Sequence, residues 1–137
     1  MTETARPATP RAAFLYGLIT RCRQARASVL RRAVRFVEQS AHQSIGLPDI
    51  AAAAGVGPRA LQLAFRRYAD TTPWAFVRSV RLVRAHHDLR TADPRRETVV
   101  GIAARWGFSN RSRFAAEYRA VYGETPAATL RGLIARG

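Results

Sequence analysis

The chain has 137 residues, 47% of them hydrophobic, and carries 23 lysines and arginines against 9 acidic residues, a net charge of +14. This length suits one domain or two closely joined subdomains and leaves little room for a separate catalytic domain. The charge excess indicates a polyanionic partner, of which nucleic acid is the usual one. Every basic side chain is arginine. Its planar fork suits phosphate and guanine, although a GC-rich coding bias produces the same preference.

Several protein classes do not fit the sequence. One cysteine, Cys22, cannot form an intramolecular disulfide or a cysteine-rich zinc site. No apolar run approaches the roughly 18 residues of a membrane span, and the N-terminus lacks the apolar core of a signal peptide. We therefore expect a cytoplasmic, nucleoid-associated protein that does not contact a membrane.

The N-terminal part of the chain is expected to hold two helices. Residues 1–11 are polar and contain prolines, which predicts a disordered tail. Apolar residues then recur at helical spacing up to Gln24. A second helix is expected from Ser28, as its N-cap, to about His42. The apolar residues of the first of these helices are Phe14, Leu15, Leu18, Ile19 and Cys22.

An internal repeat organises the rest of the chain. Residues 50–57 (IAAAAGVG) recur 52 positions later as residues 102–109 (IAARWGFS). Phe65-Arg66 recurs 53 positions later as Tyr118-Arg119, so the second copy has one extra residue at its turn. An ordered series of matches with a single slip predicts two copies of one structural unit.

Each copy has the pattern of a helix-turn-helix. Gly55 and Gly107 fall where the first helix must end, because glycine accepts the left-handed conformation that ends many helices. The second helix then begins with Pro58 in its first turn in one copy and with Ser109 as N-cap in the other. We expect these second helices over residues 58–69 and 110–122.

A long helix is expected to connect the two copies. Thr72-Pro73 is a helix start, and the helix then runs to about Thr91. At about 1.5 Å per residue it is roughly 28 Å long, close to the roughly 34 Å of one duplex turn. A rigid connector of this length suits two units that enter successive major grooves. Its buried side is expected to use Phe76, Val77, Val80, Val83 and Leu89, with Trp74 near the start.

These observations predict an all-α fold of two homeodomain-like helix-turn-helix subdomains joined by a long linker helix, with one or two extra N-terminal helices. The expected parts are a tail at 1–11, an N-terminal helix and linker at 12–27, a first subdomain at 28–71, a linker helix at 72–92 and a second subdomain at 93–137.

From about Ile45 to Arg131 the sequence resembles the DNA-binding domain of the AraC/XylS family of bacterial regulators. The resemblance implies two helix-turn-helix subdomains bridged by a helix, promoter binding, and activation through RNA polymerase as a further partner. Most members join this domain to an effector-binding or dimerisation domain, whereas about 40 residues precede it here, as in short stand-alone members. The matching stretches are residues 47–51 (LPDIA), 61–67 (LQLAFRR), 81–85 (RLVRA), 102–108 (IAARWGF), 112–114 (SRF), 118–119 (YR) and 123–126 (GETP).

The first recognition helix offers a clear outward stripe. Leu61 and Phe65, four positions apart, match the family's core positions, so the opposite side faces outward. Arg can form two hydrogen bonds with guanine and Gln two with adenine, whereas Leu offers only apolar contact. The expected base-reading residues of this helix are Arg59, Gln62 and Leu63, and the expected phosphate contacts are Arg66 and Arg67.

In the second recognition helix, Phe114 and Tyr118 take the core positions. Two alanines at the centre of its outward stripe supply little hydrogen-bonding specificity, so we expect the first unit to discriminate bases more strongly. The expected base-reading residues are Asn110, Arg111, Ser112, Ala115 and Ala116, and the expected phosphate contacts are Arg113 and Arg119.

We expect double-stranded DNA as the partner, no enzyme activity, no catalytic residue, no cofactor and no metal. Adjacent His86 and His87 point about 100° apart and chelate one ion poorly, and Trp74 and Trp106 are expected to pack in the core. Two alternatives stay open: a basic architectural protein that binds nucleic acid without regard to sequence, and an interaction module that uses an apolar segment at 12–37. The oligomeric expectation is a monomer or a weak dimer through that segment.

Overall fold

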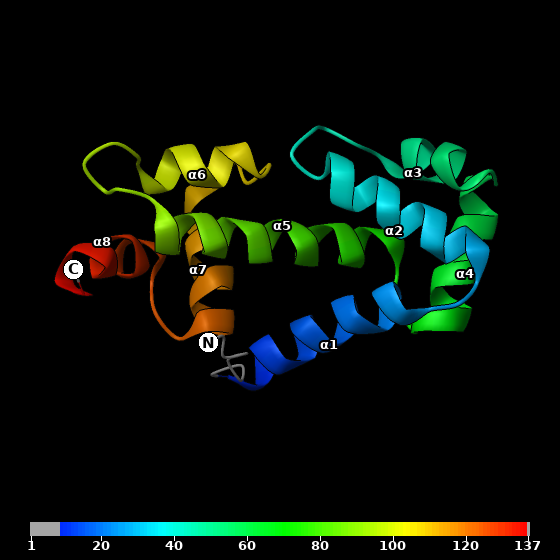
Figure 1. Ribbon diagram of the computed structural model, residues 1–137, viewed down its shortest axis with the longest axis horizontal. Coiled ribbons are helices and arrows are strands. Elements are labelled where there is room, and N and C mark those ends of the chain that lie inside the picture. The colour runs from blue at the N-terminus through cyan, green and yellow to red at the C-terminus, as the bar shows by residue number, and fades with distance from the viewer. Residues whose placement is uncertain (1–8, 137) are drawn as a thin grey trace. The chain divides into compact units, whose positions relative to one another are not determined.

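The computed structural model describes the backbone of residues 9–136 and the side chains of residues 9–132. This range contains eight helices and no strand, which confirms the predicted all-α fold (Figure 1). The helices are α1 (Pro10–Gln24), α2 (Ser28–Ser40), α3 (Leu47–Ala54), α4 (Pro58–Ala69), α5 (Pro73–Thr91), α6 (Val99–Arg105), α7 (Arg111–Tyr122) and α8 (Pro126–Arg136).

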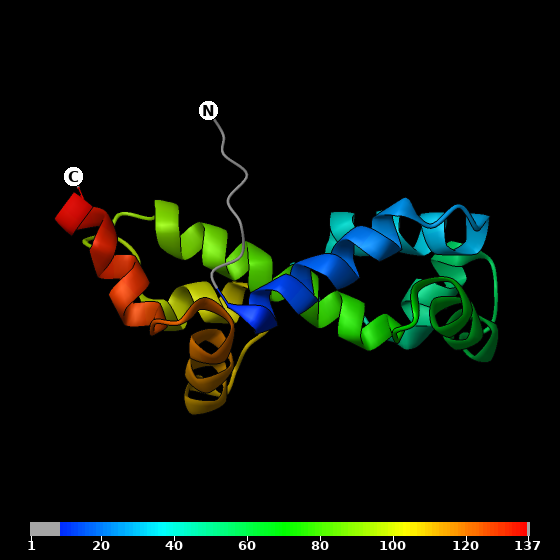
Figure 2. The ribbon, with the colours of Figure 1, turned by 90° about the horizontal axis from the view of Figure 1, so that it is seen from below.

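The chain divides into two compact units. The N-unit comprises residues 17–81, and the C-unit comprises residues 82–137 together with residues 1–16. Each unit therefore contains one pair of helices from the repeat, α3–α4 or α6–α7, and part of the long helix α5. In each pair the second helix runs steeply across the first (Figures 1 and 2).

The core of the N-unit is built from the apolar sides of α2, α3 and α4. Helix α2 is amphipathic and buries Leu30 and Val37 completely, while Arg31 and Arg35 remain exposed. Helices α4 and α5 meet through Phe65 and Phe76, whose ring centroids lie 6.1 Å apart. Other buried residues of this unit are Leu18, Ile19, Cys22, Ala33, Val34, Ile50, Ala51, Ala54, Leu61, Val77 and Val80.

Arg81 closes the C-terminal end of α2. The last carbonyl groups of a helix have no N–H partner within the helix. Nε of Arg81 donates to the carbonyl oxygen of Ala41 at 2.9 Å, and Nη2 donates to that of Gln43 at 2.7 Å. The guanidinium carbon also lies 5.5 Å from the ring centroid of Trp74. Arg81 therefore joins α5 to the end of α2 from a buried position.

Two more arginines close helix ends in the same unit. Arg32 on α2 donates twice to the carbonyl oxygen of Ala54, at 3.1 and 2.7 Å, where α3 ends. Arg21 on α1 donates to the carbonyl oxygen of Ala69 at 3.2 Å, where α4 ends. A cation at a helix C-terminus interacts favourably with the helix dipole as well as with the free carbonyl. No pattern in the sequence indicates this structural use of arginine.

The core of the C-unit lies between α5, α6, α7 and α8. Trp106 packs against this core as expected, and its Nε1 donates to Asp88 at 2.8 Å. Arg105 binds the same carboxylate at 2.8 Å and that of Glu97 at 2.6 Å, which fastens α6 to α5 and to the loop between them. The buried residues of the core are Ala12, Leu82, Ala85, Leu89, Ala92, Ile102, Ala103, Phe114, Tyr118, Val121 and Leu130.

Several expectations about helix ends and apolar side chains are wrong. Helix α1 begins at Pro10, inside the expected tail, and residues 1–8 lie outside the described residues. Ser28 does not cap α2: the N-cap is Ala27, which makes no side-chain hydrogen bond, and α2 ends at Ser40.

Two aromatic residues are exposed: Phe14, one of the apolar residues of α1, and Trp74, which was expected to pack in the core. Phe14 is 68% exposed, although it lies one turn before the buried Leu18 on α1. Trp74 is 48% exposed and makes its contact with Arg81 instead of entering the core. On α5, Val83 was expected on the buried side but is half-buried, and Leu82 is buried instead.

Candidate nucleic-acid interface

The turn between α3 and α4 has the geometry that the repeat predicts. Gly55 is left-handed, with φ 77° and ψ 24°, and its N–H bonds to the carbonyl groups of Ala51 and Ala52. Gly57 then occupies the N-cap of α4 and Pro58 its first turn. The turn is short and closed by backbone hydrogen bonds, so it fixes the direction in which α4 leaves α3.

The turn between α6 and α7 has a similar construction, with one residue more between its left-handed glycine and the N-cap of the next helix. Gly107 is left-handed, with φ 85°, and the N–H of Phe108 bonds to the carbonyl oxygen of Ala103 at 2.9 Å. The N-cap of α7 is Asn110, whose Oδ1 accepts from the N–H of Arg113 at 2.9 Å. The expectation of Ser109 as N-cap is therefore wrong, because the extra residue moves the helix start by one position.

Helix α4 turns its apolar side inward and a basic stripe outward. Leu61 and Phe65 are completely buried, as their spacing predicts. Leu63, on the outward side, is 61% exposed. The other exposed residues of this stripe are Arg59, Gln62, Arg66 and Arg67. All five predicted contact residues of α4 are thus accessible; their division into base and phosphate contacts stays a prediction.

Helix α7 has the same arrangement in the C-unit. Phe114 and Tyr118 are buried, so the opposite side faces outward. Ala115 is half-buried beside them, which leaves it less accessible than the other predicted contacts. The remaining predicted contact residues are exposed: Asn110, Arg111, Ser112, Arg113, Ala116 and Arg119.

Two of the predicted contact residues already have a polar neighbour. Because Oδ1 of Asn110 caps α7, its amide NH₂ is the group left to donate to a base. Arg66 lies 3.6 Å from the carboxylate of Asp70, four positions along, and both side chains are exposed. Exposed pairs of this kind contribute little to stability, so Arg66 can exchange Asp70 for a phosphate at low cost.

A chain of hydrogen bonds holds α7 in the C-unit. His86 Nδ1 lies 2.7 Å from the hydroxyl of Tyr118, and this hydroxyl donates to Thr129 Oγ1 at 3.0 Å. Thr129 in turn donates to the carboxylate of Glu124. Since each hydroxyl has one proton, His86 must donate from Nδ1–H. Its ring also stacks on Tyr122, with centroids 3.7 Å apart and planes 7° apart.

Burial determines the protonation of this chain. Burial is the main cause that lowers the pKa of His86 to about 4, helped by the positive charge of Arg90. Burial also raises the pKa of Tyr118 to about 12. Both groups are therefore neutral at physiological pH, and His86 acts as a hydrogen-bond donor from α5 to the buried side of the second recognition helix.

The described residues include one free thiol and no metal-binding cluster. They contain no group of three or more His, Cys, Asp and Glu side chains arranged to hold a metal ion. Burial raises the pKa of the Cys22 thiol to about 11, so this thiol is not activated as a nucleophile. No described helix combines the length and the apolar character needed to cross a membrane.

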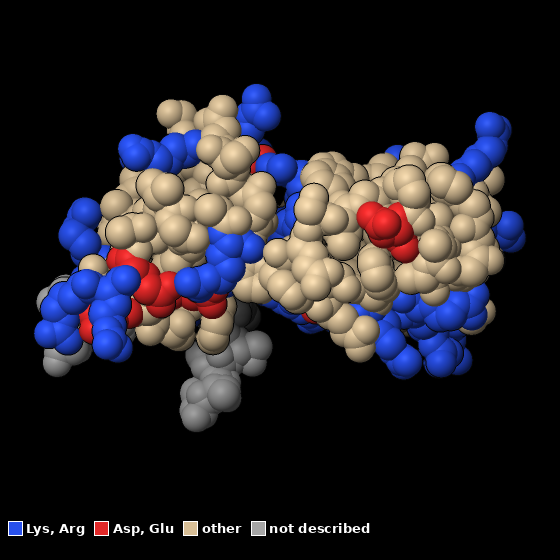
Figure 3. All heavy atoms as spheres, turned by 90° about the horizontal axis from the view of Figure 1, so that it is seen from above, with Lys and Arg blue, Asp and Glu red and all other residues tan. Residues whose placement is uncertain are grey.

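Arginine side chains dominate the charged surface. The face in Figure 3 shows basic groups spread over both parts of the molecule and acidic groups confined to small clusters. The net charge of +14 therefore surrounds the described surface with a field that attracts phosphates.

Comparison with known proteins agrees with this geometry. The sequence model of a helix-turn-helix domain family matches residues 50–132. A solved structure, a probable AraC family transcriptional regulator from Rhodopseudomonas palustris, is 33% identical with a TM-score of 0.70, and the match covers 78% of this chain and 98% of that one. The chain belongs to the AraC family.

Two curated relatives of this AraC-family chain are much longer than it. The probable thc operon regulatory protein of Rhodococcus erythropolis is 39% identical over 75% of this chain. The XylDLEGF operon transcriptional activator 3 of Pseudomonas putida is 38% identical over 73% of this chain. The match spans 31% and 30% of the lengths of these two relatives. The match therefore spans about a third of the length of these two relatives.

Proposed function

We propose that the chain is the sequence-specific DNA-binding part of a transcription regulator, and that α4 and α7 enter successive major grooves of one duplex. The observation that carries this proposal is the pair of helix-turn-helix units, each with an exposed, arginine-bearing stripe on its second helix. Family membership and the regulatory names of the relatives support binding rather than catalysis.

The two helices have different parts in this proposal. On α4, Arg59 and Gln62 read base edges with paired hydrogen bonds, and Leu63 contacts a thymine methyl group. On α7, Asn110 donates to a base through its amide NH₂. Ala115 and Ala116 make close apolar contacts with the bases. Arg111 and Ser112 complete the base-reading set, and the phosphate contacts are Arg66, Arg67, Arg113 and Arg119.

Transcriptional activation is a further part of the proposal. The Pseudomonas putida relative is named as an activator, and an activator at a promoter acts by contact with RNA polymerase. A protein with this function is associated with the nucleoid. We expect it to bind as a monomer or a weak dimer through residues 12–37.

Selection from a random duplex library tests the function. We expect enrichment of a non-palindromic site with two conserved blocks about one helical repeat apart, since the two units differ in their reading side chains. Competition against bulk DNA then measures the preference for this site. Binding without enrichment of any sequence contradicts the proposal and favours an architectural protein.

A pair of variants tests the division of labour. Arg59→Ala should relax specificity, at a cost of about 1–3 kcal/mol on the selected site and less on scrambled DNA. Arg119→Ala should lower the affinity for the selected and the scrambled duplex alike and reduce the salt dependence of binding. Equal losses on the two duplexes for Arg59→Ala refute its role as a base reader.

A further inference from the structure

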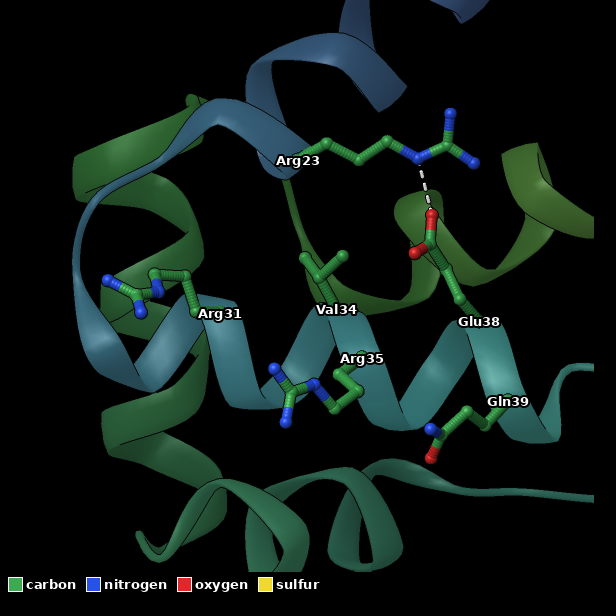
Figure 4. Close-up of a pocket in the computed structure, with 6 residues that line it drawn as sticks. All are labelled: Arg23, Arg31, Val34, Arg35, Glu38 and Gln39. Carbon is green, nitrogen blue, oxygen red and sulfur yellow. Dashed lines mark hydrogen bonds and ion pairs between the residues drawn. The ribbon is translucent and has the colours of Figure 1, made fainter.

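A shallow groove of about 420 Å³ lies in the N-unit, away from the outward stripe of α4 (Figure 4). One side is formed by Arg23 at the end of α1, and the rest by the solvent-facing side of α2. Both elements precede residues 50–132, which match the family's sequence model. The lining residues are Arg23, Arg31, Val34, Arg35, Glu38 and Gln39.

Two arginines of this groove have no ion-pair partner among the described residues. Arg31 and Arg35 stand one turn apart on α2, exposed, and such like-charged neighbours destabilise a helix. The single carboxylate of the groove, Glu38, is already bound by Arg23. The structure of the N-unit therefore gives these two guanidinium groups no stabilising role.

Neighbouring arginines show what a structural role looks like. Arg21 and Arg32 come from the same stretch of chain, yet each bonds to the carbonyl end of another helix. Residues 21–35 contain no acidic residue to balance these charges. Unlike those of Arg21 and Arg32, the guanidinium groups of the exposed Arg31 and Arg35 are available to a ligand.

The position of the groove argues against DNA as the ligand of Arg31 and Arg35. Helix α2 buries Leu30 and Val37 against the core, so Arg31 and Arg35 project away from α3 and α4. These two arginines therefore lie on another helix than the outward stripe of α4, which we propose as the DNA-reading surface.

Carboxylates on a protein fit the groove better. The guanidinium fork binds a planar carboxylate through two parallel hydrogen bonds. Side chains one turn apart on a helix are separated by about 5–6 Å, so two carboxylates with the same spacing match Arg31 and Arg35. The geometry points to a docking site for an acidic helical segment of a partner protein, which binds these arginines.

A fluorescent, alanine-based helical peptide with two glutamates one turn apart tests this inference, with its glutamine twin as the control probe. We expect it to bind the wild-type chain in an anisotropy titration and the twin to bind far more weakly. The double variant Arg31→Glu/Arg35→Glu should lower the affinity for the peptide by about tenfold or more. Arg96→Glu/Arg131→Glu, an equal charge change on exposed C-unit residues, should weaken it by about twofold at most.

Several results overturn the inference. Equal losses for the two double variants mean that the peptide senses net charge alone. A larger loss of duplex affinity and a flatter salt dependence for Arg31→Glu/Arg35→Glu than for its control assign the groove to DNA. Self-association in sedimentation that this variant abolishes assigns it to a second copy of the chain. If circular dichroism shows that the charge reversal prevents folding, Arg35→Gln replaces it in the same comparison. We expect this variant to lose several-fold in affinity for the peptide. The proposed reading of DNA by α4 and α7 is measured separately and does not depend on this outcome.

Discussion

Replacement of Arg81 by methionine removes the guanidinium that closes α2 and keeps most of the apolar bulk of the side chain. Arg81 is 8% exposed and donates to Ala41 at 2.9 Å and to Gln43 at 2.7 Å. Hydrogen bonds from a charged donor contribute about 1.5–3 kcal/mol each. Burial opposes the charge, as the lowered pKa of Arg81 indicates, and relief of this cost offsets part of the loss. We expect Arg81→Met to destabilise the protein by about 2–4 kcal/mol.

Urea denaturation followed by circular dichroism measures this difference. Arg81→Lys should be intermediate, since a single ammonium group retains the charge but does not have the fork that reaches both carbonyl groups. Arg90→Met, an exposed position on the same helix, is the matched control and should lie within about 0.5 kcal/mol of the wild type.

Two results refute the reasoning about Arg81. If Arg81→Met unfolds at the same urea concentration as Arg90→Met, the two hydrogen bonds do not stabilise the fold. If Arg81→Lys equals the wild type, the charge at the end of α2 matters and the forked geometry does not.

Three further predictions concern the C-unit and the turns, each measured by the free energy of unfolding. Gly55→Ala should cost about 1–2 kcal/mol because φ is 77°, whereas Gly57→Ala, at φ −79° with open space around it, should change stability by about 0.5 kcal/mol at most. Asn110→Ala should cost about 1 kcal/mol through loss of the α7 cap; an unchanged stability contradicts that role. The pKa of His86 is lowered from 6.5 to about 4, so the unfolded chain binds more protons between these pH values and stability should decrease as the pH falls through this window. His86→Gln should flatten this decrease and exposed His87→Gln should not; equal pH profiles of the two variants count against the buried, neutral state.

The sequence alone determined the two helix-turn-helix units and which side of α4 and of α7 faces outward. These features depend on local chemistry: a left-handed glycine ends a helix, and a threonine followed by proline begins one. The N–H of Ala75 bonds to Thr72 Oγ1 at 3.1 Å, and that of Ala128 bonds to Thr125 Oγ1 at the same distance. The spacing of Leu61 and Phe65 likewise determined which side of α4 is buried.

Only the tertiary structure decided what each arginine does. The sequence does not distinguish three arginines that all lie within helices: Arg59, Arg81 and Arg35. The first lies on an exposed recognition stripe, the second bonds to carbonyl groups about 40 positions earlier in the chain, and the third lines a groove between α1 and α2. The long, flexible side chain of arginine can reach partners on any neighbouring helix, so its role depends on how the helices pack. Helical periodicity describes one helix at a time and contains no information about those distances.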